Sequence, residues 1–94
     1  GLTENIPRVL PDACAAHLQR DSWPRTELFT WLQTTAGIDD AEMCRTFNNG
    51  IGMVLVLDAA HAASCAKTLA DLGEQVFQIG VIADKGQGAA VVID

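Results

Sequence analysis

Near the middle of the chain stands the stretch Met43-Cys44-Arg45-Thr46-Phe47-Asn48-Asn49-Gly50-Ile51-Gly52-Met53-Val54. It joins a polar segment with two glycines to an apolar run that continues to Leu57. Asn48-Asn49-Gly50 is a turn signal, because asparagine and glycine tolerate the backbone conformations that turns require. A continuous apolar run is typical of a strand buried on both faces. The stretch therefore predicts a turn that leads into a sheet strand over residues 51–57.

Two helices are predicted before this stretch. Thr3 is a suitable cap for a short first helix, and Pro11 ends that segment. A second helix follows Ser22 or Trp23 as its cap, and Gly37 is a natural stop at its C-terminus. A helix cap this close to the first residue also leads us to expect that the chain is a fragment of a longer protein.

Two further helices are predicted around and after the stretch. Asp39 and Glu42 resemble a capping box, which predicts a short helix or turn from Asp40 to about Thr46. Asp58 is the expected cap of a longer helix that ends before Gly73. The apolar residues that recur at helical spacing and form its expected inward face are Ala62, Cys65, Ala66, Leu69 and Leu72.

Residues 13–18 are compatible with a helix or a strand, of which we favour a strand, and residues 76–83 and 89–93 are predicted as two more strands. The last two flank residues 84–88, which have the composition of a hairpin loop. The connection from 51–57 through the long helix to 76–83 fits a right-handed crossover. The expected fold class is α+β, a layered α/β domain with a mixed sheet of about four strands packed by helices.

Composition limits the possible partners. The 94 residues make one domain, and their formal net charge is −6, which is poorly matched to nucleic acid or an anionic membrane surface. Three scattered cysteines indicate neither a disulfide framework nor a zinc site and fit a reducing, cytoplasmic location. No apolar run reaches membrane-spanning length. We expect no metal site, no nucleic acid and no membrane as partner, although clustered N–H groups can still bind a phosphate.

The turn after Phe47 has two interpretations. It is either a cradle in which Gly50 and Gly52 bring the main chain close to a ligand while Asn48 and Asn49 supply amide groups, or simply a turn before a buried strand. Gly-x-Gly alone lacks both the Rossmann fingerprint and the Walker lysine, so the spacing does not decide between them.

Other candidate side chains also have two interpretations. Glu42 and Arg45 are three residues apart and form either a surface ion pair or a phosphate contact through Arg45. Trp23, Phe29 and Trp31 are predicted to form an aromatic cluster in the core or at an interface. No Ser-His-Asp, Cys-His or paired-carboxylate arrangement is visible, so the catalytic residues are unknown.

Three stretches resemble the C-terminal part of phosphoribosylformylglycinamidine cyclo-ligase, also called aminoimidazole ribonucleotide synthetase. They are Gly1-Leu2-Thr3-Glu4-Asn5-Ile6-Pro7-Arg8-Val9-Leu10-Pro11, then Trp23-Pro24 with Leu28-Phe29-Thr30-Trp31-Leu32-Gln33, and then Glu42 to Met53. Residues 76–80 are similar to a late strand of that family. Asn49 departs from the family pattern, in which Cys or Met is frequent at this position.

The resemblance implies an ATP-dependent ring closure in purine biosynthesis. Formylglycinamidine ribonucleotide would be converted to aminoimidazole ribonucleotide, with ADP and phosphate as products and Mg2+ offsetting the phosphoryl charge. Such enzymes are homodimers, and their N-terminal ATP-binding and dimerisation domain is missing from residues 1–94, so the fragment alone should be inactive. The substrate-binding residues implied by the resemblance are Gly1, Leu2, Thr3, Glu4, Asn5, Asn48, Gly50 and Gly52.

Two alternatives stand beside this hypothesis. The chain is otherwise the substrate-binding domain of a related ATP-dependent synthetase, of the selenophosphate, thiamine-phosphate or hydrogenase-maturation type, or it is a non-catalytic interaction domain. A substrate screen on the intact protein separates the cyclo-ligase from a related synthetase. A complete interaction domain should lack a large exposed apolar surface, whereas a domain without its partner should expose one.

Overall fold

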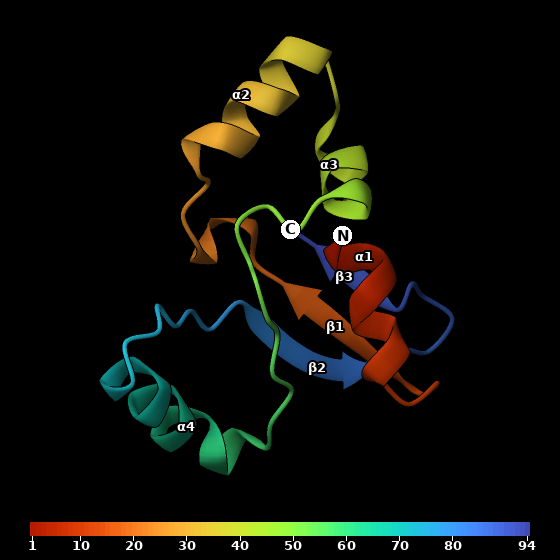
Figure 1. The fold of residues 1–94 in the computed structure, drawn as a ribbon. Coiled ribbons are helices and arrows are strands. Elements are labelled where there is room, and N and C mark those ends of the chain that lie inside the picture. Colours follow the sequence, from red (N-terminus) through yellow and green to blue (C-terminus); the bar gives the residue numbers. More distant parts are fainter.

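The computed structural model describes residues 1–94 and shows an α+β fold around a mixed sheet (Figure 1). The predicted class is confirmed, but the sheet has three strands and not about four. None of the helices combines the length and the apolar character that crossing a membrane requires. The elements in chain order are α1 (Leu2–Asn5), the 3-10 helix η1 (Ile6–Val9), β1 (Cys14–Leu18), the 3-10 helix η2 (Arg20–Ser22), α2 (Glu27–Ala36), α3 (Asp40–Thr46), α4 (Ala59–Asp71), β2 (Gly80–Asp84) and β3 (Val91–Ile93).

Strand β1 lies at the centre of the sheet, antiparallel to β2 and parallel to β3. The strand predicted at residues 13–18 is therefore confirmed. The predicted hairpin over 84–88 is wrong, because β2 and β3 lie on opposite sides of β1. The N–H group of Lys85 donates to the carbonyl of Ala13 at 2.9 Å, so the loop passes the start of β1 instead of folding back on β2.

The predicted strand at 51–57 is an extended segment outside the sheet. It is green in Figure 1 and runs in front of the sheet. Its apolar run suggested burial on both faces, but β2 and β3 already occupy both edges of β1, and Met53 is 81 % exposed. Only Ile51 and Val54 pack against the core. The predicted crossover is wrong because residues 51–57 are not a strand of the sheet. The strand predicted at 76–83 begins only at Gly80.

Helix α2 begins later than predicted. Its N-cap is Thr26, so neither Ser22 nor Trp23 caps it. Trp23 is extended, with φ −137° and ψ 151°, because a following proline disfavours the helical region for the residue before it. Gly37 ends α2 in the left-handed conformation with φ 65°, as predicted.

The other helix ends follow local signals in part. The carboxylate of Asp39 accepts a hydrogen bond from the N–H group of Glu42 at 2.8 Å, which confirms the predicted cap of α3. The predicted cap of α1 is wrong, because Gly1 occupies the N-cap position and Thr3 lies inside the helix. Helix α1 has no capping side chain. The position of α1 depends instead on contacts with α3 that are described below.

Helix α4 follows Asp58 and is followed by Gly73, with φ 96°, so both predicted ends are close. Four residues of its predicted inward face are half-buried, whereas Leu72 is 75 % exposed because it lies beyond the last turn. No residue of α2 or α4 is fully buried. Both helices extend away from the sheet in different directions (Figure 1). The radius of gyration of 14.0 Å accordingly exceeds the value of about 12 Å for a compact chain of this length.

The core lies between the sheet and the N-terminal helices. Leu2 of α1 and Ile6 of η1 pack on one face of β1. Only 10 of 94 residues are buried, so the core is small and the N-terminal segment supplies an essential part of it. The buried members of this cluster are Leu2, Ile6, Ala16, Leu18, Trp23 and Val91.

Candidate functional site

A cavity of about 300 Å³ lies between the N-terminal helices and the mid-chain turn. Five of the predicted substrate-binding residues line it, whereas Thr3, Glu4 and Gly50 do not. Two segments far apart in the sequence therefore line one cavity. The lining residues are Gly1, Leu2, Asn5, Ile6 and Val9 from the first segment, and Asn48, Ile51, Gly52, Met53 and Val54 from the second.

Gly1 holds one wall of this cavity in place through close backbone packing. A Cβ atom at Gly1 would lie 2.3 Å from the carbonyl oxygen of Cys44 and 2.5 Å from that of Arg45. Only glycine permits such an approach between two backbones. The end of α3 therefore fixes where α1 begins, and with it the position of Leu2 and Asn5 in the cavity wall.

Glu4 faces α3 and not the cavity. Its carboxylate lies 3.4 Å from Nη1 of Arg45, and Arg45 also binds Glu42 on its own helix, with Nε donating to Oε2 at 2.8 Å. Hydrogen bonds from Arg45 and then from the hydroxyl of Thr46 lower the pKa of Glu42 to about 2. Of the two interpretations of Glu42 and Arg45, the structure contains the ion pair. The separate ion pair of Arg45 with Glu4 links α3 to α1 at the surface.

The mid-chain turn is closed by its own side chain. Oδ1 of Asn48 accepts a hydrogen bond from the N–H group of Gly50 at 3.0 Å. Asn49 has φ 52° and Gly50 has φ 97°, conformations that asparagine and glycine adopt most readily. A Cβ atom at Gly50 would meet the methyl group of Thr26 at 3.2 Å, so this glycine packs against the loop before α2.

Hydrogen-bond donors remain free in the turn residues that line the cavity. The amide nitrogen of Asn48 donates no hydrogen bond within the chain, and neither do the main-chain N–H groups of Gly52 and Met53. A Cβ atom at Gly52 would meet nothing within 4 Å. The cavity therefore presents N–H donors beside the apolar side chains of Leu2 and Ile6, a combination suited to a small ligand with an apolar part and an oxygen acceptor.

A second cavity, of about 240 Å³, was not predicted from the sequence. Its wall includes Asn49, which is 1 % exposed, and the indole of Trp23, whose Nε1 donates to the carbonyl of Asn49 at 3.1 Å. Asn49 departs from the pattern of the family that the sequence resembles, and its side chain is among the most buried in the molecule. The one available signal was an asparagine before glycine, which marks a left-handed turn residue. The lining residues are Arg20, Asp21, Trp23, Arg25 and Asn49.

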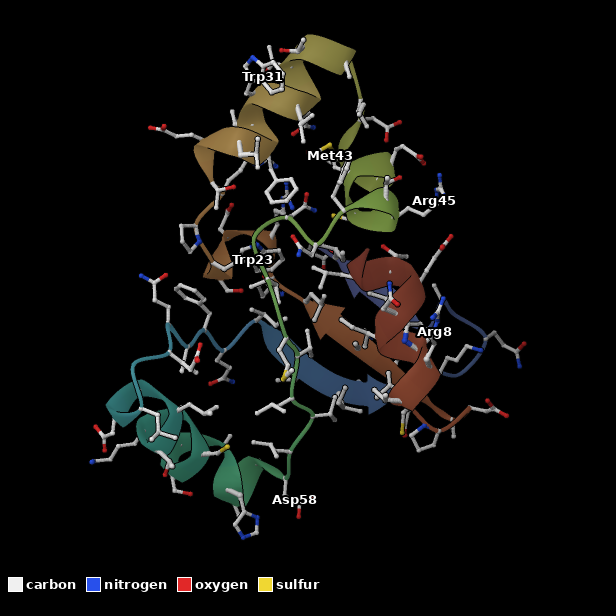
Figure 2. The ribbon with its side chains drawn as sticks, viewed as in Figure 1. Arg8, Trp23, Trp31, Met43, Arg45 and Asp58 are labelled. Atoms are coloured by element: carbon white, nitrogen blue, oxygen red, sulfur yellow. The ribbon has the colours of Figure 1, made fainter.

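The predicted aromatic cluster is wrong. Trp23 is buried in the core, whereas Trp31 is 60 % exposed and lies far from it on α2 (Figure 2). Phe29 instead packs on Phe47 with ring centroids 5.9 Å apart. Helical spacing placed the three rings together, but α2 begins after Trp23, so the first of them is not on that helix.

Neither histidine belongs to a cluster with other metal-binding side chains. No group of three His, Cys, Asp or Glu residues gathers in a position to hold a metal ion. His61 is exposed and lies 3.8 Å from Asp58, the residue that precedes α4. The cavity between α1 and the turn is consequently lined by amide, main-chain and apolar groups alone.

Comparison with known proteins identifies a family and several relatives of this chain. Residues 1–93 match the family described as AIR synthase related protein, C-terminal domain. A protein of Polaromonas sp. is 71 % identical over 99 % of this chain, and one of Albidiferax ferrireducens is 68 % identical over the same share. A protein of Burkholderia mallei is 48 % identical over 99 % of the chain. All three relatives carry the name phosphoribosylformylglycinamidine cyclo-ligase.

The matched region is a minor part of those relatives. It spans 27 % of the length of the first two and 26 % of the third. The match nevertheless includes both segments that line the cavity between α1 and the turn. The chain therefore belongs to the family of AIR synthase related proteins, as a representative of their C-terminal domain.

Proposed function

We propose that this chain works as the C-terminal domain of a phosphoribosylformylglycinamidine cyclo-ligase and forms one wall of its substrate cleft. The observation that carries the proposal is the single cavity lined by the N-terminal segment and the mid-chain turn. The names of the relatives support the assignment to purine biosynthesis. We propose that the protein is cytoplasmic, because three free cysteines fit a reducing compartment and purine biosynthesis fits the same location.

The proposed reaction closes the imidazole ring of formylglycinamidine ribonucleotide. Phosphorylation of the formyl oxygen by the co-substrate ATP makes that oxygen a good leaving group, and attack by the amidine nitrogen then gains from intramolecular proximity. The products are aminoimidazole ribonucleotide, ADP and phosphate. In this chain, the amide of Asn48 and the N–H groups of Gly52 and Met53 hold an oxygen-bearing part of the substrate.

ATP and Mg2+ belong to the proposed function of the longer protein. The residues described here do not fit a magnesium site, because no group of His, Cys, Asp or Glu converges on either cavity as a ligand set. We therefore assign no phosphoryl-transfer step to side chains of this chain. We propose that the 94-residue chain alone is inactive and that a preceding ATP-binding domain completes the site.

Exposed apolar side chains support a covering domain. Leu55, Phe77 and Val81 are all more than a third exposed on three separate segments, together with Met53 on the turn segment. Where exposed apolar side chains are contiguous, they mark an interaction surface. We propose that the N-terminal domain, and a second copy in a homodimer, cover this surface. The same exposure weighs against a self-contained interaction domain.

Gly52→Val tests the cavity in the natural-length protein. The new side chain meets no atom within 4 Å at its Cβ position, so the fold should persist while the cavity narrows. We expect the KM for formylglycinamidine ribonucleotide to rise about 10-fold, with stability within about 0.5 kcal/mol of the parent. Ala89→Val, on an exposed loop away from the cavity, is the control. An unchanged KM in a folded Gly52→Val enzyme would remove this cavity from substrate binding.

A panel of substrates distinguishes this function from that of a related synthetase. ADP release should be triggered by formylglycinamidine ribonucleotide and not by selenide, thiamine monophosphate or a carbamoylated peptide. ATP cleavage with one of the latter compounds alone would keep the family and exclude the cyclo-ligase.

A further inference from the structure

The second cavity has the features of a ligand site that is separate from the first. Asn48 lines the first cavity and Asn49 the second, so the turn divides them. The volume of about 240 Å³ equals that of about eight water molecules at roughly 30 Å³ each. We propose that this cavity binds a small zwitterion with a carboxylate and an ammonium group, of which an α-amino acid is the simplest class.

Arg20 supplies the carboxylate contact. Its side chain is only 17 % exposed, and its guanidinium lies 5.9 Å from the ring centroid of Trp23. The only hydrogen bond that the guanidinium donates goes to the sulfur of Cys44 at 3.7 Å. Its Nη2 lies 3.8 Å from Oδ1 of Asp40. A guanidinium has five N–H donors in a fork that matches a carboxylate. Most donors of this largely buried group are therefore unused.

Arg25 has a different role on the rim of the cavity. Its Nη2 donates to Oδ1 of Asp40 at 3.1 Å, and it also binds the side chain of Gln33. Hydrogen bonds from Gln33 and then from Arg25 hold the pKa of the Asp40 carboxyl below its usual value. Arg25 donates to two oxygen acceptors, whereas Arg20 makes one hydrogen bond to sulfur and a 3.8 Å ion pair with Asp40, so Arg20 has more donors left for a ligand.

The cavity wall also contains acceptors. Nδ2 of Asn49 donates to the sulfur of Cys44 at 3.5 Å, whereas its Oδ1 is buried without a partner. Asp21 lines the same cavity and forms no ion pair within the chain. A cationic N–H donor would satisfy both the buried Oδ1 of Asn49 and the carboxylate of Asp21.

The charges around the cavity also favour a zwitterion. Arg20 and Arg25 are balanced by Asp21 and Asp40, so the site has no excess positive charge for a multiply charged anion. A ligand of zero net charge with separated groups fits better, its carboxylate at Arg20 and its ammonium between Asp21 and Asn49. Trp23, which also lines the cavity, then contacts its aliphatic part.

Tryptophan fluorescence of the natural-length protein tests the proposal. In a Trp31→Phe background, titration with L-alanine should give a saturable change that depends on Trp23. Arg20→Gln should weaken this binding at least 10-fold. Arg8→Gln removes the same charge from an exposed position that lines neither cavity, and it should bind L-alanine like the parent. Equal binding by the two variants, or no saturable change, would overturn the proposal.

Two single-charge analogues of the ligand and a second variant test each proposed contact separately. Acetate carries only the carboxylate and methylammonium only the donor, so each should bind at least 10-fold more weakly than L-alanine. Acetate that binds as tightly as L-alanine would exclude the zwitterion. Asp21→Asn lies at the exposed side of the cavity and should also weaken L-alanine binding, which keeps the proposal testable if Arg20→Gln does not fold. Unchanged binding in Asp21→Asn would contradict the ammonium contact.

Discussion

Gly80→Ala should destabilise the protein because it breaks the pairing of β1 with β2. Gly80 lies opposite Leu18 at the end of the ladder, and a Cβ atom there would be 2.1 Å from the carbonyl oxygen of His17 and 2.8 Å from the Cα atom of Leu18. Real Cβ contacts essentially never fall below 3.0 Å, and both neighbours are backbone atoms that cannot rotate away. The strands must separate locally.

The size of the effect follows from this separation. Moving the strands by about 1 Å stretches the adjacent hydrogen bond from Gln19 to Ile79, now 2.8 Å, to roughly 3.8 Å, beyond the normal range. One lost backbone hydrogen bond costs about 0.5–1.5 kcal/mol, and overpacking costs a further ~1–3 kcal/mol. We expect a loss of about 2–4 kcal/mol. With a urea m value of about 1.5 kcal/mol/M, the midpoint falls by roughly 2 M.

Urea unfolding followed by far-UV circular dichroism measures this shift. Gly52→Ala is the matched control, because a Cβ atom at Gly52 meets nothing within 4 Å and the change should stay within about 0.5 kcal/mol. If Gly80→Ala unfolds at the same urea concentration as Gly52→Ala, the close approach of β1 to β2 at this position is not real.

Two further predictions concern α3. Asp39→Ala should lower the free energy of unfolding in urea by about 1 kcal/mol because it removes the hydrogen bond to the N–H group of Glu42. Asp39→Asn should keep most of that stability, since its side-chain oxygen can still accept the bond. Equal losses in the two variants would refute the cap. Since the pKa of Glu42 is lowered to about 2 in the folded protein, its stabilising effect should be complete above pH 4.5 and disappear as the pH falls towards 2. Glu42→Gln should therefore flatten the pH dependence of stability in that range, and parallel curves for parent and variant would contradict this.

The predicted site residues came together only in part. Leu2 and Asn5 share a cavity with Asn48 and Gly52, which agrees with the idea of one pocket between two remote segments. Glu4 faces Arg45 instead, because the partner that attracts it lies on another helix. The cavity of Arg20 and Asn49 was not predicted at all. Its members come from the 3-10 helix η2, the loop that follows it and the mid-chain turn, and no spacing in the sequence relates Asn49 to the others.

By itself the amino-acid sequence determined the helix ends whose signals are local. Gly37 and Asp39 act within one turn of their own helices, so neighbouring residues suffice to identify them. Tertiary structure alone decided which extended segments joined the sheet. Residues 51–57 and β3 are similarly apolar, but strand pairing depends on hydrogen-bond partners distant in the chain, and β1 has only two edges to offer.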